Sequence, residues 1–257
     1  MTGRRWTISA ARAYQACPHQ YYLTRVENVP RDVGSGNARG VLLHAGLAAG
    51  YSTANWCQLQ GLIGDELRSY RDSAVMDAID RETARLGLQG DPNDEPVDTV
   101  IAALDHLGPL PDDVVLGVEH ELQITHQGAP IGMRVDVLYR REGRLTVRDW
   151  KSTSELPRAQ DLPFNRQLAL GALCAARIFG DTQVWIEIAS INAGVAVTGP
   201  IRAEQARAAG DAVAETADKA EADTEFLPTP GSACATCPVW RSCPAHSKVP
   251  AMTGDHE

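Results

Sequence analysis

Residues 132–153 read Gly-Met-Arg-Val-Asp-Val-Leu-Tyr-Arg-Arg-Glu-Gly-Arg-Leu-Thr-Val-Arg-Asp-Trp-Lys-Ser-Thr. Apolar residues alternate with polar ones on both sides of Glu142 and Gly143, and this pattern predicts two β-strands joined by a hairpin turn. If Glu142 and Gly143 form the turn, Arg141 faces Arg144. The stretch therefore predicts a sheet, and the turn predicts which residues oppose one another across it.

The same register makes Asp136 face Asp149. Opposed side chains lie about 5 Å apart at Cβ, and two carboxylates at that distance repel each other unless a cation lies between them. Lys151 projects from the same face as Asp149, so the pattern predicts a divalent-metal site with an ammonium group nearby. The alternative is a solvated Asp-x-Lys ion pair, and a three-residue loop would break the assumed register.

Length and composition suit a globular protein with one large domain or two small ones. The chain has 257 residues, of which 44% are hydrophobic, which is enough to form a core. No apolar run approaches the roughly 18 residues of a membrane span, and the first seven residues lack the apolar region of a signal peptide. We therefore expect a cytoplasmic protein with no membrane partner.

The net charge of −9 is unevenly distributed. Residues 61–121 hold 15 acidic residues against four Arg, whereas residues 1–40 hold six Arg against two acids, and residues 131–151 hold six Lys or Arg against three acids. We expect the basic N-terminal region and the basic hairpin to form a positive surface, with the acidic segment facing away.

Helical patterns dominate the chain before the hairpin. We expect a helix from Thr7 or Ser9, broken at Cys17-Pro18, an apolar helix from residue 38, one or two amphipathic helices with an acidic outer face over 56–87, and a helix over 97–107. Loops are expected at 27–37 and 88–96. His44 lies in the apolar helix, where it is either a core histidine or a metal ligand.

Strands and a further helix surround the hairpin. Residues 114–126 predict a strand that would place Glu119 beside Asp136 and Asp149. Residues 164–179 predict a helix ended by Gly180, with Gln167, Leu170, Cys174 and Ile178 on one stripe. Gln167 either caps the helix or points into the site. Strands are expected at 182–190 and 194–199, and a surface helix at 201–222.

Cysteines cluster near the end of the chain. Cys234, Cys237 and Cys243 have the spacing C-x2-C-x5-C, and Cys17 is the candidate for a fourth ligand. Zinc and an iron–sulfur cluster both accept four thiolates. Such a site would join the N-terminal helix to the C-terminal tail.

Taken in order, these motifs resemble the RecB-type nucleases of the PD-(D/E)XK superfamily. The resemblance is strongest to the iron–sulfur branch, which includes CRISPR-associated RecB-like exonucleases and related phage exonucleases. It covers almost the whole chain and rests on the following residues: Ser9; Cys17-Pro18 with Tyr21-Tyr22-Leu23; Gly40 to His44; Val118-Glu119; Gly132 to Asp136; Asp149 to Thr153; Gln167; and the three C-terminal cysteines.

The resemblance implies a role for each matching residue. His44, Asp136 and Asp149, with the backbone carbonyl of Trp150, would bind Mg²⁺ or Mn²⁺, and oxygen ligands with one imidazole suit those ions better than zinc. Lys151 would orient or activate the attacking water and stabilise charge on the phosphate. Glu119 would support the metal or water, and Gln167 would steady the site or contact DNA.

The resemblance further implies a structural [4Fe-4S] cluster on Cys17, Cys234, Cys237 and Cys243, with zinc as the less favoured occupant. Two residues depart from the family pattern. Gly171 stands where the family often has tyrosine, which puts a DNA contact or hydrogen bond in doubt, and Trp150 replaces the tyrosine that is frequent inside the Asp-x-Lys motif.

We therefore expect an α/β, PD-(D/E)XK restriction-endonuclease-like core in a single domain, 1–257. Its central sheet of about five strands, mixed or mostly antiparallel, would be flanked by helices. Residues 38–113 would form a helical part and 114–200 the catalytic core. Segments 1–37 and 228–247 would be joined by the cysteine-ligated cluster.

The function predicted is metal-dependent exonuclease cleavage of single-stranded DNA or DNA ends. The chain has no Gly-x4-Gly-Lys-Ser/Thr motif, so we expect no motor activity. The settings left open are recombination, DNA repair and CRISPR spacer handling, each with its own partner proteins. The alternatives are a non-catalytic DNA-binding or assembly subunit with this fold, and a structural zinc protein in which the Asp/Lys hairpin is incidental.

Overall fold

The computed structural model describes residues 5–30, 38–88 and 94–245. Parts of the loops expected at 27–37 and 88–96, and the outer ends of the two expected cluster-binding segments, lie outside these residues. The chain forms two compact units. The larger comprises the described residues of Ser35–Ile124 and Gly132–Gly210, and the smaller those of Met1–Gly34, Thr125–Ile131 and Asp211–Glu257.

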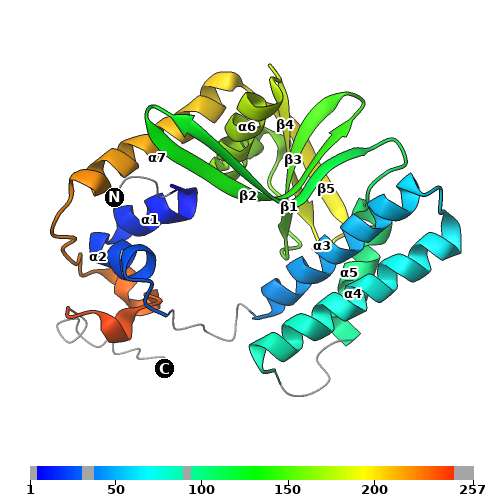
Figure 1. Ribbon diagram of the computed structural model, residues 1–257, viewed down its shortest axis with the longest axis horizontal. Coiled ribbons are helices and arrows are strands. Elements are labelled where there is room, and N and C mark those ends of the chain that lie inside the picture. The colour runs from blue at the N-terminus through cyan, green and yellow to red at the C-terminus, as the bar shows by residue number, and fades with distance from the viewer. Residues whose placement is uncertain (1–4, 31–37, 89–93, 246–257) are drawn as a thin grey trace. The chain divides into compact units, whose positions relative to one another are not determined.

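The order of elements along the chain agrees closely with the sequence pattern (Figure 1). The helices are α1 (Ile8–Ala16), α2 (Pro18–Tyr21), the π-helix η1 (Tyr22–Val26), α3 (Ala38–Leu59), α4 (Gly64–Leu86), α5 (Asp94–Leu107), the 3-10 helix η3 (Ala159–Phe164), α6 (Arg166–Phe179), α7 (Ala203–Ala222), and the 3-10 turns η4 (Ser232–Thr236) and η5 (Trp240–Ser242). The strands are β1 (Val114–His126), β2 (Ala129–Arg141), β3 (Arg144–Lys151), β4 (Val184–Ser190) and β5 (Val195–Ile201).

The five strands form one mixed sheet in the order β1-β2-β3-β4-β5. β3 is antiparallel to β2 and parallel to β4, and β4 is antiparallel to β5. The parallel pair is connected through α6, as a crossover between parallel strands requires. The predicted α/β class, with a mixed sheet flanked by helices, is confirmed. No helix in the described segments is long and apolar enough to cross a membrane.

The central hairpin has the predicted register. Arg141 pairs with Arg144, and the ladder continues to the pair Val137 and Arg148. The turn residues Glu142 and Gly143 have φ angles of 52° and 77°, the left-handed conformation at both central positions that a two-residue hairpin needs. The hairpin therefore carries Asp136 and Asp149 to the same end of the sheet.

Helices α3, α4 and α5 share a hydrophobic core with the sheet. That core includes Leu43, Leu47 and Tyr51 from α3 and Trp150 from β3. Helix α6 packs against β3 and β4. The helix packs closely at Gly171, where an added Cβ would lie 2.9 Å from the Met133 sulfur.

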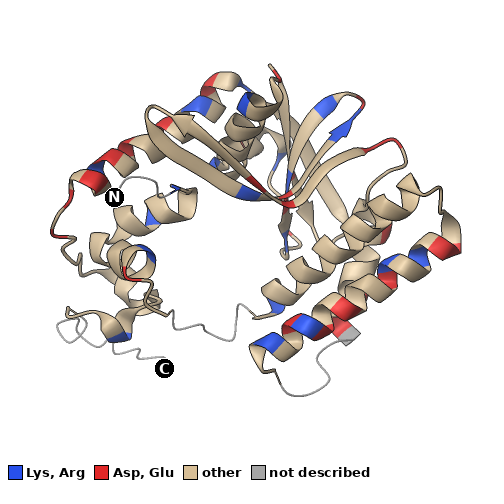
Figure 2. Ribbon diagram, in the orientation of Figure 1, with Lys and Arg blue, Asp and Glu red and all other residues tan. Residues whose placement is uncertain are grey.

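The basic residues of the hairpin do not form the positive surface that we expected. Each of its six cations has an acidic partner within 4 Å: Arg134 with Glu119, Arg140 with Asp181, Arg141 with Asp113, Arg144 with Glu142, Arg148 with Glu187 and Lys151 with Asp149. Counts over the hairpin missed most of this pairing, because four of the six partners lie outside it: Glu119, Asp113, Asp181 and Glu187. Figure 2 shows acidic and basic residues interspersed along α4.

Arg148 is the extreme case, since it is buried rather than exposed. Its guanidinium donates hydrogen bonds to Glu187 and to the Leu107 carbonyl, and it lies 4.9 Å from the centre of the Trp150 ring. Glu187 also accepts a hydrogen bond from Tyr139 at 3.1 Å. This paired, hydrogen-bonded network compensates for burial of both charges.

Two details of the predicted helices are corrected. Ile178 was expected on the buried stripe of α6, but it is 46% exposed, because the fully buried part of α6 ends at Ala175. The region 56–87 contains the last residues of α3 and all of α4, and a break between them occurs at Gly61 and Gly64, both with positive φ.

The smaller unit brings the N-terminal helices to the C-terminal segment. Thr7 caps α1 by accepting a hydrogen bond from the Ala10 amide. Tyr14 donates a 2.9 Å hydrogen bond to Asp223, and the rings of Tyr22 and Phe226 stack with centres 5.2 Å apart. These contacts join the two ends of the chain independently of any metal cluster.

Candidate active site

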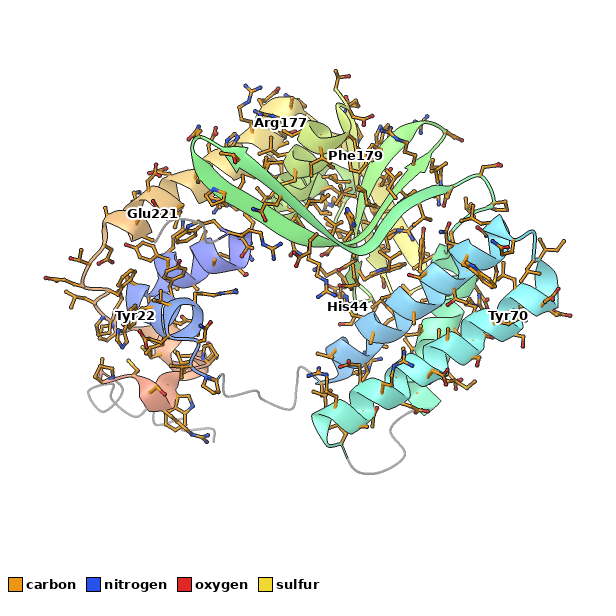
Figure 3. The ribbon with its side chains drawn as sticks, viewed as in Figure 1. Tyr22, His44, Tyr70, Arg177, Phe179 and Glu221 are labelled. Atoms are coloured by element: carbon orange, nitrogen blue, oxygen red, sulfur yellow. The ribbon has the colours of Figure 1, made fainter. Side chains whose placement is uncertain are left out.

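His44 enters the site from α3, as the label in Figure 3 shows. Its neighbours Leu42 and Leu43 are buried in the core, but the His44 side chain itself is 38% exposed. Its Nδ1 atom lies 3.7 Å from Asp136 Oδ1 and 3.9 Å from Glu119 Oε1. His44 is therefore not a core histidine, and its imidazole faces two carboxylates.

Glu119 reaches the site from β1 through an unusual backbone conformation. Its φ angle is 49°, a left-handed value that is uncommon for a residue other than glycine and interrupts the alternation of a regular strand. Such conformations are concentrated at functional sites. The sequence pattern correctly placed Glu119 beside Asp136, but it carried no sign of this backbone conformation.

Three predicted residues converge on one point. His44, Glu119 and Asp136 each offer a ligand atom, and these atoms all lie within 4.8 Å of one another. Ligands on opposite sides of a Mg²⁺ ion lie about 4.2 Å apart, since each bond is about 2.1 Å long. The spacing and the donor types, one nitrogen and two carboxylates, fit a hard divalent cation.

Asp136 carries the most perturbed carboxyl group of the site. Burial raises its pKa to about 6, and the negative charges of Asp149 and Glu119 add to this effect, whereas His44 and the Trp150 amide oppose it. The Asp136 Oδ2 atom accepts a 2.6 Å hydrogen bond from the Trp150 N–H. A buried carboxylate whose ionisation is opposed by its neighbours is well suited to bind a cation.

The hydrogen bond to Trp150 also bears on the predicted backbone ligand. In a strand, the N–H and C=O of one residue point toward the same neighbouring strand. Because the Trp150 N–H points to Asp136, its carbonyl faces the same edge of β3. Trp150 thus keeps its predicted place as a candidate carbonyl ligand.

Asp149 and Lys151 form a second pair beside this group. Lys151 Nζ lies 2.5 Å from Asp149 Oδ2, while Asp149 Oδ1 accepts a 3.1 Å hydrogen bond from Gln167 Nε2. Asp149 is not among the three residues whose ligand atoms all lie within 4.8 Å of one another. Here it holds a lysine and a glutamine in place.

The first turn of α6 positions Gln167. The Asn165 side chain caps the helix and accepts hydrogen bonds from the amides of Gln167 and Leu168. Gln167 is consequently free to point into the site, which was one of its two predicted orientations. A tyrosine at Gly171 would require neighbouring side chains to shift, because an added Cβ would also lie 3.1 Å from a Val147 methyl.

A cavity of about 620 Å³ opens over the site. Its lining includes His44, Glu119, Asp136 and Lys151, together with two residues that we did not predict, Arg134 and Glu82. Arg134 lies two residues before Asp136 on the same strand, so strand alternation could have found it. Glu82 comes from α4, and no local pattern connects it to the site.

The four predicted cysteine ligands lie together in the smaller unit. Cys17, Cys234, Cys237 and Cys243 line one cavity. Burial raises the pKa of the Cys237 thiol, and the charges of the other three cysteines raise it further. The Thr229 amide donates a hydrogen bond to the Cys17 sulfur at 3.3 Å.

Comparison with solved structures gives matches at low sequence identity. A protein from Eubacterium rectale, described as a candidate exonuclease, matches with a TM-score of 0.50 and 12% identity, over 91% of this chain and 86% of its own. The protein SSO0001 matches with a TM-score of 0.31 and 16% identity, over 70% of this chain and 81% of its own. A search of curated proteins found no significant match.

The sequence profile described as the PD-(D/E)XK nuclease superfamily matches residues 5–244. This range contains the sheet, the residues of the candidate site and all four clustered cysteines. The chain therefore belongs to the PD-(D/E)XK nuclease superfamily.

Proposed function

We propose that this protein is a metal-dependent DNA exonuclease. The observation that carries the proposal is the convergence of His44, Glu119 and Asp136 within 4.8 Å, next to the Asp149–Lys151 pair. Membership of a nuclease superfamily supports it further. Phosphodiester hydrolysis needs a nucleophilic water and positive charge near the phosphate oxygens, and these residues can provide both.

Each side chain has a role that follows from its contacts. His44, Glu119 and Asp136 would hold Mg²⁺ or Mn²⁺, with Asp149 and the Trp150 carbonyl at the edge of the ligand set. The ion, when bound, lowers the pKa of water and polarises a phosphate oxygen. Lys151 orients the water and stabilises the negative charge that develops on the phosphate. Gln167 and Asp149 fix the position of that lysine.

The substrate that we propose is single-stranded DNA or a DNA end, in the cytoplasm. The choice of single strands or ends as substrate is supported by the resemblance to RecB-type exonucleases.

A structural [4Fe-4S] cluster on Cys17, Cys234, Cys237 and Cys243 is part of the proposal. The four cysteines line one cavity of the smaller unit. Four thiolates can hold either a [4Fe-4S] cluster or one zinc ion, and the resemblance to the iron–sulfur branch favours the cluster.

The test is digestion of DNA labelled at one end, single-stranded and double-stranded, with Mn²⁺, Mg²⁺ or EDTA. Wild type is compared with Asp149→Ala after purification without oxygen, and the visible absorption spectrum is recorded. We expect metal-dependent cleavage by wild type and its loss in the variant, with broad visible absorption from the cluster. The label shows the polarity of digestion.

Two results would contradict the proposal. Absence of cleavage by a folded, metal-loaded wild-type protein would favour the non-catalytic DNA-binding subunit. A colourless protein that contains one zinc ion per chain would exclude the iron–sulfur cluster while leaving the nuclease assignment to the digestion assay.

A further inference from the structure

Arg134 is a cation of the active-site cavity that has no part in the proposed hydrolysis step. It projects from β2, its side chain is 60% exposed, and it lines the same cavity as His44 and Asp136. Its Nε atom lies 2.6 Å from Glu119 Oε2. Within the described segments, Glu119 is its only acidic partner.

Glu119 uses its two oxygens for different purposes. Oε1 faces His44 at 3.9 Å, and Oε2 holds the Nε edge of Arg134. A guanidinium has five N–H donors in a planar fork. The contact with Glu119 occupies one edge of that fork, so the two terminal amino groups stay available for another acceptor.

The charges around the cavity favour a phosphodiester anion as the acceptor for these amino groups. Glu82, Glu119 and Asp136 line the cavity as acids, and Lys151, its other long cationic side chain, is paired with Asp149. A phosphodiester anion that enters is repelled by the carboxylates unless a cation faces it. Guanidinium groups bind phosphate oxygens through paired hydrogen bonds, and Arg134 is the exposed group placed to do so.

We infer that Arg134 binds a backbone phosphate of the nucleic acid substrate and that Glu119 aims its guanidinium at that phosphate. The inference rests on the proposed nuclease function, because it assigns a substrate contact to the same cavity. It makes Glu119 the link between the cation-binding group and the residue that holds the substrate. The positive φ of Glu119 directs its side chain to that position.

The test compares wild type, Arg134→Ala and Arg134→Lys in two separate assays. The first measures binding of a fluorescein-labelled oligothymidylate in EDTA, where metal-dependent cleavage cannot occur, at a series of salt concentrations. The second measures the affinity for Mn²⁺ without DNA by calorimetry. Arg68→Ala is the matched control, because Arg68 is an exposed arginine of α4 that pairs with Asp65 and does not line the cavity.

For Arg134→Ala we expect about ten-fold weaker DNA binding, since one hydrogen-bonded ionic contact is lost. The slope of log K against log salt should become shallower by about 0.7, the value for one phosphate contact on single-stranded DNA. Arg134→Lys keeps the charge and should keep the slope, with weaker binding because the fork is lost. Arg68→Ala should match wild type in affinity and slope.

The substitution Arg134→Ala should not weaken Mn²⁺ binding, in contrast to its effect on DNA binding. Removing a cation from Glu119 frees that carboxylate, so Arg134→Ala should bind Mn²⁺ at least as tightly as wild type. Weaker binding of both Mn²⁺ and DNA would overturn the inference, because it would mean that Arg134 merely supports the shape of the site. An unchanged DNA affinity and salt slope would also overturn it.

The inference and the proposed function can fail separately. If wild type cleaves DNA and Arg134→Ala binds DNA like wild type, the inference fails and the nuclease assignment stands. If wild type binds DNA through Arg134 but cleaves nothing with Mn²⁺ or Mg²⁺, the exonuclease assignment fails. Absence of DNA binding by wild type would overturn both.

Discussion

Asp136→Asn is expected to stabilise the metal-free protein at pH 8 while destroying its cation site. Burial and the charges of Asp149 and Glu119 raise the pKa of Asp136 from the ordinary 3.8 to about 6. Each ten-fold change in an acid dissociation constant corresponds to about 1.4 kcal/mol, so ionisation of this carboxyl in the folded state is unfavourable by about 3 kcal/mol. A neutral asparagine removes this penalty.

The substitution preserves the hydrogen bond that orients the side chain. Asparagine has a carbonyl oxygen that can accept the Trp150 N–H in place of Asp136 Oδ2. The free energy of unfolding in EDTA should therefore rise by up to about 3 kcal/mol at pH 8. Urea denaturation followed by circular dichroism measures this difference.

The pH dependence has a definite sign. A carboxyl group whose folded-state pKa is raised destabilises the protein above that pKa, and the penalty disappears as the pH falls below the unfolded-state pKa. The advantage of Asp136→Asn should therefore be full at pH 8, shrink as the pH falls from about 6 to 4, and vanish below the ordinary pKa of 3.8. Adding Mn²⁺ at pH 8 should reverse the order, because only wild type gains stability from binding the ion.

Asp65→Asn is the matched control, since the Asp65 side chain is 98% exposed. It should change the free energy of unfolding by no more than about 0.5 kcal/mol. An Asp136→Asn variant no more stable than wild type at pH 8 in EDTA would show that ionised Asp136 costs the folded state nothing. A gain of equal size at pH 4 and pH 8 would show that the effect does not come from ionisation.

Three other substitutions test separate parts of the molecule. Lys151→Ala should lower the initial rate of DNA cleavage at least 100-fold with an unchanged far-UV spectrum, and full activity would remove Lys151 from the mechanism. Cys237→Ala should reduce the visible absorption of the cluster and lower the melting temperature, because a ligand that links distant segments is lost; an unchanged melting temperature would argue against the cluster. Glu187→Gln should decrease the free energy of unfolding by about 3–5 kcal/mol in urea denaturation, because it leaves the Arg148 charge uncompensated, and a loss below 1 kcal/mol would show that the buried pair is dispensable.

The hairpin and the order of elements could be predicted because both depend on local patterns. Alternation around Glu142-Gly143 predicted the correct register, and strand 114–126 was predicted with its observed bounds. The end of α6 was equally local, since Gly180 follows its last turn as predicted, whereas the helix begins at Arg166 after the Asn165 cap and not at residue 164. Neighbouring residues decide such features, so they can be read without the rest of the fold.

The charge of the hairpin could not be predicted from its own residues. Arg148 looked like part of a basic surface, but it is buried against Glu187 from β4. The partner lies 39 positions away in the sequence. Whether an arginine is a surface charge or a buried structural group depends on which strands become neighbours, and composition does not contain that information.

The sequence by itself determined the α/β class, the hairpin with its Asp136–Asp149–Lys151 motif, and the cysteine spacing. Packing was needed to show that His44 from α3 lies against Asp136 rather than in the core, that Gln167 from α6 contacts Asp149, and that Glu82 from α4 lines the same cavity. The physical reason is the range of the interactions. Periodicity and turn chemistry act over a few residues, whereas a cation site is formed by side chains that only packing of α3 against the sheet brings within a few ångströms.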